Sequence, residues 1–111
     1  MTTYELIRCY SYRMTANIII QMHTNDGDDL TIFNWVAKDN RHPDDGSYSN
    51  VLYYIPNDIA NAMVENFDII PQHIVSCGEL IKLSDTETLY ITIPSYGRLY
   101  RYLEDDNYPF I

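Results

Sequence analysis

The most constraining feature of the sequence is an alternating apolar segment that an Asp-Gly turn can fold back on itself. Ile18, Ile20 and Met22 recur at every second position, which is the spacing of one face of a β-strand. A second segment is dense in β-branched and aromatic residues, which favour strands. Between the two, the chain reads Thr-Asn-Asp-Gly-Asp-Asp, and Asp-Gly supplies the positive φ angles of a tight turn. The sequence therefore predicts a hairpin with strands over 17–23 and 30–37.

Further strands and loops are predicted from the same signals. Residues 3–12 alternate with a period of two, and aromatic or β-branched residues are frequent in several later segments. The polar run 38–50 contains Pro43 and Gly46 and predicts a long exposed loop. One or two helical turns are expected over 71–77, ended by Gly78. Additional strands are expected over 3–12, 51–55, 80–83, 89–93 and 96–103, with a turn over 84–87 joining the third and fourth of these.

One principal α-helix is predicted over 57–67. Pro56, Asn57 and Asp58 supply turn and cap chemistry, and apolar residues then recur at helical spacing as far as Phe67. The opposite face would carry an acidic stripe of Asp58, Glu65 and Asp68. We therefore expect one α+β domain over 1–111, with a mainly antiparallel sheet of about five to six strands and the helix 57–67 packed on one face. A chain of this length buries about two-thirds of its unfolded surface, enough for a core.

The charge is strongly negative. The chain has 16 Asp and Glu against seven Lys and Arg, a formal net charge of -9, and its only lysines are Lys38 and Lys82. Binding to nucleic acid requires a positive stripe, which the dispersed basic residues do not provide. The cationic and aromatic run 98–102 is followed by the acidic run 104–106, which offsets its field. The charge therefore disfavours direct nucleic-acid binding and indicates a positively charged partner.

The cellular compartment follows from hydropathy and cysteine usage. The apolar runs are far shorter than the roughly 20 residues of a membrane span, and no basic-then-apolar leader opens the chain. Cys9 and Cys77 are far apart and are expected to be reduced. The 46% hydrophobic content argues against a disordered acidic tail. A folded protein of the cytoplasm, without contact to a membrane, is expected.

No pattern in the sequence predicts catalysis, a cofactor or a metal. The four glycines are too scattered for a phosphate-binding loop, and His23, His42 and His73 lack the spacing of metal ligands. His73 and Cys77 lie four residues apart, so on a helix they would share a face as a nucleophile and a base. No third catalytic group accompanies them. We expect no enzymatic activity; a small enzyme with a cleft around His73 and Cys77 is the alternative from another functional class.

The acidic residues concentrate in predicted turns, the long loop, the helix stripe and the C-terminal run. Eleven tyrosines beside three phenylalanines exceed the needs of a core, and tyrosine is enriched in protein interfaces. Tyr53, Tyr54 and Tyr90 are expected to pack in the sheet, whereas other tyrosines would anchor a partner. The candidate partner-binding residues are Asp26, Asp28, Asp29, Asp39, Asp44, Asp45, Tyr48, Asp58, Glu65, Tyr96, Tyr100, Tyr102, Glu104, Asp105 and Asp106.

In composition, this short, acidic and Tyr-rich chain resembles the phage-borne anti-CRISPR and anti-restriction proteins. The resemblance implies a non-enzymatic inhibitor, acting in the host cytoplasm, that binds the basic nucleic-acid-binding surface of an enzyme or effector complex. Carboxylates two residues apart in extended chain are about 6.6 Å apart, close to two axial steps of one DNA strand, so they can mimic phosphates. The alternative partner is a basic nuclease toxin, which an immunity or antitoxin-like protein would neutralise.

Overall fold

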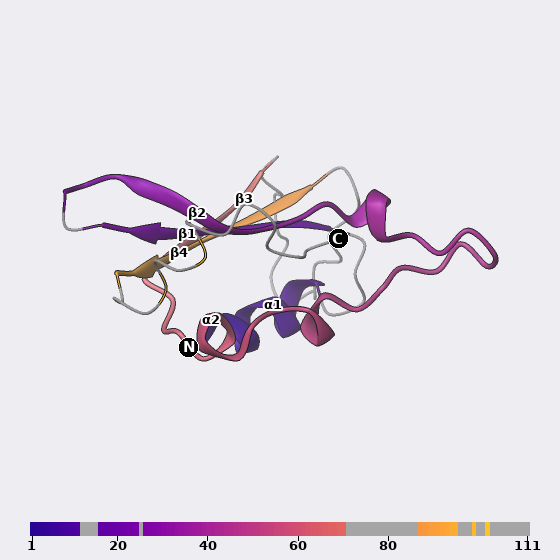
Figure 1. Ribbon diagram of the computed structural model, residues 1–111, viewed down its shortest axis with the longest axis horizontal. Helices are drawn as coiled ribbons and strands as arrows, with labels where there is room; N and C mark the ends of the chain where they lie inside the picture. The colour runs from indigo at the N-terminus through magenta and orange to yellow at the C-terminus, as the bar shows by residue number, and fades with distance from the viewer. Residues whose placement is uncertain (12–15, 25, 71–86, 96–98, 100–101, 103–111) are drawn as a thin grey trace, which may run out of the picture.

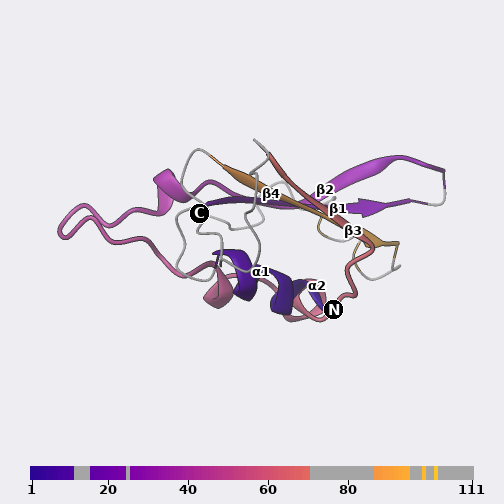
Figure 2. The same ribbon diagram turned by 180° about the vertical axis from the view of Figure 1, so that it is seen from behind.

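In the computed structural model, the described residues are 1–11, 16–24, 26–70, 87–95, 99 and 102. They form one sheet with the two α-helices on one side of it (Figures 1 and 2). No helix among these residues is long and apolar enough to cross a membrane. In chain order the elements are α1 (Thr3–Ser11), β1 (Asn17–His23), β2 (Asp29–Trp35), the 3₁₀ helices η1 (Ala37–Asn40) and η2 (Val51–Tyr53), α2 (Asn57–Ala60), β3 (Asn66–Ile70) and β4 (Thr88–Pro94).

The sheet has four strands in the order β2-β1-β4-β3. The central pair, β1 and β4, is parallel, with Ile18 beside Leu89 and His23 beside Pro94, while the two outer pairs are antiparallel. The α+β class is confirmed. The expectation of five to six mainly antiparallel strands was wrong for the described residues, because two predicted strands are helical and the central pairing joins distant segments in parallel. The alternation of apolar and polar residues within one segment does not show whether it pairs with a distant strand in the parallel or the antiparallel direction.

Side chains on the two central strands alternate between a buried and a partly exposed face. The buried members are Ile18, Ile20, Met22, Leu89, Ile91 and Ile93, and they share one core cluster with Leu6 and Ile7 of α1 and Ile59 of α2. The intervening residues of both strands are partly exposed. No described helix covers that second face (Figure 1). The fold is thus a sheet with one face packed against helices, which explains the alternating pattern of the sequence.

The predicted β1–β2 hairpin is confirmed. His23 lies opposite Asp29 and Ile18 opposite Trp35. The register shifts after Ile20, so that Ile32 is an extra residue in β2, and its side chain is buried. A bulge of this kind places successive residues of one strand toward the core and increases the local twist.

The predicted strand over 3–12 is instead the helix α1. The Glu5 N–H donates to Thr2 Oγ1 at 3.2 Å, and the Thr2 N–H donates to Glu5 Oε1 at 2.9 Å. This reciprocal pair is a capping box, which fixes the first turn of a helix. Thr3, Leu6 and Ile7 are fully buried, as expected for one helical face and not for a strand. The Thr-x-x-Glu spacing was the sequence signal for this helix.

The segment 51–55 was predicted as a strand, but it contains η2. The Asn50 side chain accepts the Leu52 N–H at 3.0 Å, and the Ile55 N–H donates to the Val51 carbonyl at 3.0 Å. An asparagine immediately before an apolar run favours such a helical start. Tyr53 is 85% exposed and does not pack in the sheet, whereas Tyr54 is 48% exposed and the centre of its ring lies 5.4 Å from that of Trp35 in β2.

The predicted helix 57–67 was wrong beyond its first turn. α2 ends at Ala60, and β3 begins six residues later. Between them, the Thr3 N–H donates to the Ala62 carbonyl and the Val64 N–H donates to the Met1 carbonyl, at 2.9 and 3.0 Å. These bonds to the start of the chain replace the intrahelical ones. The acidic stripe of a continuous helix therefore does not exist.

The last third of the chain is described in part. The strand predicted over 89–93 is confirmed as β4. The predictions for 71–77 and 80–83 lie outside the described residues. Within 96–103, only Leu99 and Tyr102 are described, and both are buried and neither lies in a strand. Glu87, expected in an exposed turn, is 5% exposed, and its carbonyl accepts the Asn17 N–H at the start of β1.

Candidate partner-binding surface

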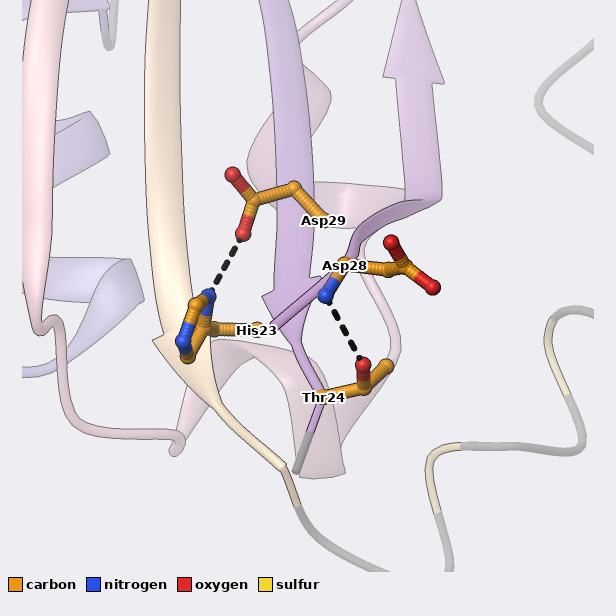
Figure 3. Close-up of polar contacts among 4 residues, drawn as sticks. All are labelled: His23, Thr24, Asp28 and Asp29. Atoms are coloured by element: carbon orange, nitrogen blue, oxygen red, sulfur yellow. Dashed lines mark hydrogen bonds and ion pairs between the residues drawn. The ribbon is translucent and has the colours of Figure 1, made fainter. Parts of the chain in front are cut away.

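The β1–β2 turn is held together by its backbone and one threonine. The Gly27 N–H donates to the Thr24 carbonyl at 3.0 Å, and Gly27 has the positive φ of 86° that follows such a turn. Thr24 Oγ1 accepts the Asp28 N–H at 3.2 Å, and the Thr24 N–H donates to the Asp28 carbonyl at 2.8 Å. The Asp26 and Asp28 side chains are exposed. Figure 3 shows the Asp28 carboxylate directed away from Thr24 and His23. The turn therefore presents carboxylates that its own hydrogen bonds do not use.

At the base of this turn, His23 pairs with Asp29. Nδ1 of His23 lies 2.9 Å from Oδ1 of Asp29 across the β1–β2 ladder (Figure 3). The hydrogen bond to Asp29 raises the pKa of His23 above 6.5; desolvation opposes this, and the charges of Asp29 and Glu65 add to it. Both side chains are about half exposed, at 45% and 48%. The pairing partly offsets the charge of Asp29 when His23 is protonated.

We define the hairpin end as Asp26, Asp28, Asp29 and Glu65. Glu65 immediately precedes β3, and its N–H donates to the Thr92 carbonyl of β4 at 2.9 Å. Thr92 pairs with Gln21 of β1, two residues before His23, which places Glu65 at the same end of the sheet as the turn. All four acids are exposed. Among the described residues, no Lys or Arg forms an ion pair with any of them. The hairpin end is thus a negative surface in which, among the described residues, only His23 pairs with an acid.

A second acidic segment, the finger, comprises residues 38–48. An antiparallel β-bridge between the backbones of Arg41 and Tyr48 joins its two arms. The Arg41 guanidinium lies 5.6 Å from the centre of the Tyr48 ring, which allows a cation–π contact. Arg41 Nε also donates to the Gly46 carbonyl at 3.1 Å. Asp45 accepts hydrogen bonds from the N–H and the hydroxyl of Ser47, which lower the pKa of its carboxyl.

These contacts change the expected role of the finger. Tyr48 is half-buried and packs against the core, so it supports the finger. Asp39 and Asp44 are exposed, but Lys38 and Arg41 belong to the same segment and offset much of its negative charge. The finger is therefore a less negative surface than the hairpin end, which contains no Lys or Arg.

The hairpin end and the finger lie at opposite ends of the molecule in both views (Figures 1 and 2). The seven residues of β2 run between them, and at about 3.3 Å per residue this strand alone spans roughly 20 Å. The predicted acidic residues of the two segments therefore do not form one continuous surface.

The remaining predicted residues divide into buried and undescribed ones. The Tyr102 hydroxyl donates a hydrogen bond to Asp58 Oδ1, and Tyr102 is only 7% exposed. Asp58 is half-buried at the start of α2. This pair links the C-terminal third to the helical layer, and we remove both residues from the proposed surface. Outside the described residues lie Tyr96, Tyr100, Glu104, Asp105 and Asp106, and also His73 and Cys77 of the alternative enzyme cleft.

Sequence reasoning placed Asp68 on an exposed helix stripe and not in a strand. It was assigned to the helix stripe and left out of the partner-binding set, yet it is exposed in the middle of β3. The sequence signal for the strand β3 was the Asn-Phe-Asp-Ile-Ile stretch, in which Asn and Asp alternate with apolar residues and two β-branched residues follow.

Among the described residues, no group of three His, Cys, Asp or Glu side chains is placed to hold a metal ion. In comparisons with known proteins, no family model matched the chain, and neither did any curated protein or solved structure.

Proposed function

We propose that this protein is a small, non-enzymatic acidic inhibitor that binds the basic nucleic-acid-binding surface of another protein through its hairpin end. Carboxylates of the hairpin end would occupy positions that phosphates take on the partner's Lys and Arg side chains. Nucleic acid would then be excluded by competition. The resemblance in composition to anti-CRISPR and anti-restriction proteins is consistent with this role.

The observation that carries the proposal is the charge of the hairpin end, with which no described Lys or Arg forms an ion pair. The whole chain has 16 Asp and Glu against seven Lys and Arg. Neither Asp26 nor Asp28 takes part in an ion pair with any described residue. Such a field accelerates association with a basic partner and weakens with added salt.

The shape of the turn also supports binding to a basic partner. Two exposed carboxylates project from a hairpin whose backbone is fixed by three hydrogen bonds, so little conformational entropy is lost when a partner binds them. The His23–Asp29 pair closes the base of the turn. A protruding, negative element suits a concave basic groove.

Affinity capture from a bacterial lysate tests the proposal. The immobilised chain is washed at low salt and eluted in steps, alongside two variants that lose the same charge: Asp26→Asn with Asp28→Asn at the hairpin end, and Asp39→Asn with Asp44→Asn in the finger. We expect a basic nucleic-acid-binding protein that duplex DNA or RNA displaces and that the hairpin-end variant fails to retain.

The matched finger variant is the control for net charge. If both variants lose the captured protein equally, the hairpin end has no special role. If the captured protein resists both salt and nucleic acid, competition by charge mimicry is wrong. A captured nuclease toxin would identify the immunity-like form of the same mechanism.

A further inference from the structure

We infer that the Asp26–Gly27 pair in the β1–β2 turn is a site of spontaneous covalent modification, at which aspartate is converted to isoaspartate. The amide nitrogen of a glycine that follows an aspartate can attack the aspartate's own side-chain carboxyl carbon, because glycine has no Cβ to obstruct the approach. The chain contains two such pairs, Asp26–Gly27 and Asp45–Gly46. Their surroundings differ in a way that favours the reaction at the first pair. This inference does not depend on the proposed function.

The reaction needs no reagent besides water. The bond between the Gly27 nitrogen and Cγ of Asp26 forms while the bond from Cγ to the carboxyl hydroxyl breaks. The amide proton leaves with that hydroxyl as water, and a cyclic imide remains. Water then opens the ring at either carbonyl. Opening at the main-chain carbonyl gives isoaspartate, whose backbone runs through Cβ and Cγ and whose charge is unchanged.

The two pairs share the features that bear on the attacking nitrogen. Both aspartates are exposed, and both glycines have a positive φ, 86° at Gly27 and 74° at Gly46. Each glycine N–H also donates a hydrogen bond, to the Thr24 carbonyl at 3.0 Å and to the His42 carbonyl at 2.9 Å. That hydrogen bond has to open at both pairs, so it does not decide between them.

The carboxyl group of the finger pair is restrained. Asp45 Oδ1 accepts the Ser47 N–H at 2.9 Å and the Ser47 hydroxyl at 2.7 Å. These bonds fix the orientation of the carboxyl and lower its pKa, so less of it is in the neutral form that loses a hydroxyl. Arg41 Nε donates to the Gly46 carbonyl at 3.1 Å, which restrains the backbone beside the reacting group.

The carboxyl group of the hairpin pair is not restrained in this way. Among the described residues, none forms a hydrogen bond or an ion pair with the carboxylate of Asp26. The Thr24 hydroxyl accepts the Asp28 N–H instead. A Cβ added to Gly27 would meet no described atom within 4 Å, whereas one on Gly46 would lie 3.3 Å from an Arg41 nitrogen. Asp26 is therefore the more reactive of the two aspartates.

Isomerisation would change the shape of the hairpin end and leave its charge as it is. The added main-chain carbon would lie inside the turn that the hydrogen bonds between Thr24 and Asp28 close. The carboxylate of residue 26 would be attached directly to Cα, and so would lie closer to the main chain.

Peptide mapping of the full chain tests the inference. The folded chain is incubated in mildly acidic buffer made with heavy-oxygen water, so that each ring opening inserts one heavy oxygen atom. Trypsin cleaves after Lys and Arg, which places the two pairs in separate peptides, 14–38 and 42–82. Digestion in ordinary water and mass spectrometry then give both rates, and fragmentation locates the label and the isoaspartate. We expect both products at Asp26 to accumulate at least about fivefold faster than at Asp45, the factor by which one ordinary hydrogen bond shifts an equilibrium.

Two controls show whether the fold causes the difference. In concentrated urea the hydrogen bonds to Asp45 are lost, and the two rates should converge. Ser47→Ala removes one donor and should raise the rate at Asp45 alone, with a thermal melt to verify that the variant is folded. Equal rates in the folded chain, a faster reaction at Asp45, or a ratio that persists in urea would overturn the inference. An unchanged rate at Asp45 in the Ser47 variant would overturn the protection assigned to the Ser47 hydroxyl.

Discussion

Replacing Ile91 by Ala should test the one-sided packing of the sheet most sharply. Ile91 is fully buried in β4, between Ile20 of β1 and Phe67 of β3. The change removes three carbon atoms, worth about 2.4 kcal/mol at roughly 0.8 kcal/mol each. A cavity term adds to this, because neighbours on two flanking strands cannot collapse freely into the space. We expect a loss of about 3–4 kcal/mol, within the known range for such changes.

The matched control is Ile19→Ala, the same chemical change on the partly exposed face of β1. Its neighbours there are in contact with solvent, so a loss of about 1 kcal/mol is expected. Urea unfolding followed by Trp35 fluorescence suits both variants, because this indole is 1% exposed in the fold and becomes hydrated on unfolding. The melting temperature of the Ile91 variant should fall by at least about 12 °C. Equal losses for the two variants would refute the assignment of a covered and an open face.

Three smaller changes probe local features. Asp29→Asn should lower the pKa of His23 toward 6.5 in an NMR titration, and an unchanged pKa would contradict the pairing. Because the pKa of His23 is raised in the folded protein, the pair stabilises the fold below pH 6.5, and this stabilisation is lost as the pH rises through the folded-state pKa. Thr2→Ala should cost about 1 kcal/mol of unfolding free energy in urea through loss of the α1 cap, and no change would argue against the capping box. Gly27→Ala should cost about 1–2 kcal/mol, from the positive φ alone, because no atom lies within 4 Å of the added Cβ; a stabilised variant would exclude this turn geometry.

Local patterns sufficed where short-range contacts decide the structure. The β1–β2 hairpin could be predicted because alternation and an Asp-Gly turn act within a few residues of each other. β4 was recognisable for the same reason. In α1, the alternation of Tyr4 and Leu6 suggested a strand, although the capping pair Thr2 and Glu5 already indicated a helix.

Long-range contacts explain the other errors. The helical spacing after Ile59 is real, but Ala62 and Val64 bond to the start of the chain, and β3 then pairs with β4. Tertiary pairing overrides local propensity in such segments. The parallel β1–β4 pair joins residues about seventy positions apart, which no local signal encodes.

The candidate surface could be predicted only in its parts. Acids in turns were expected to be exposed, and Asp26, Asp28 and Asp44 are. The sequence did not show that the finger and the hairpin end lie at opposite ends, or that Tyr102 is buried against Asp58. Those facts depend on how distant elements pack. Among the described residues, they separate the acids of the hairpin end from those of the finger.

The most direct test of the account is the salt dependence of binding to the captured partner. The association constant is measured from 50 to 300 mM salt for the natural chain, the variant Asp26→Asn with Asp28→Asn, and the finger variant Asp39→Asn with Asp44→Asn. We predict a steep fall for the natural chain, and a slope reduced by about one for each hairpin-end charge that contacts the partner. The finger variant should keep the natural slope. A flat dependence for the natural chain, or equal slopes for the natural chain and the hairpin-end variant, would contradict the account.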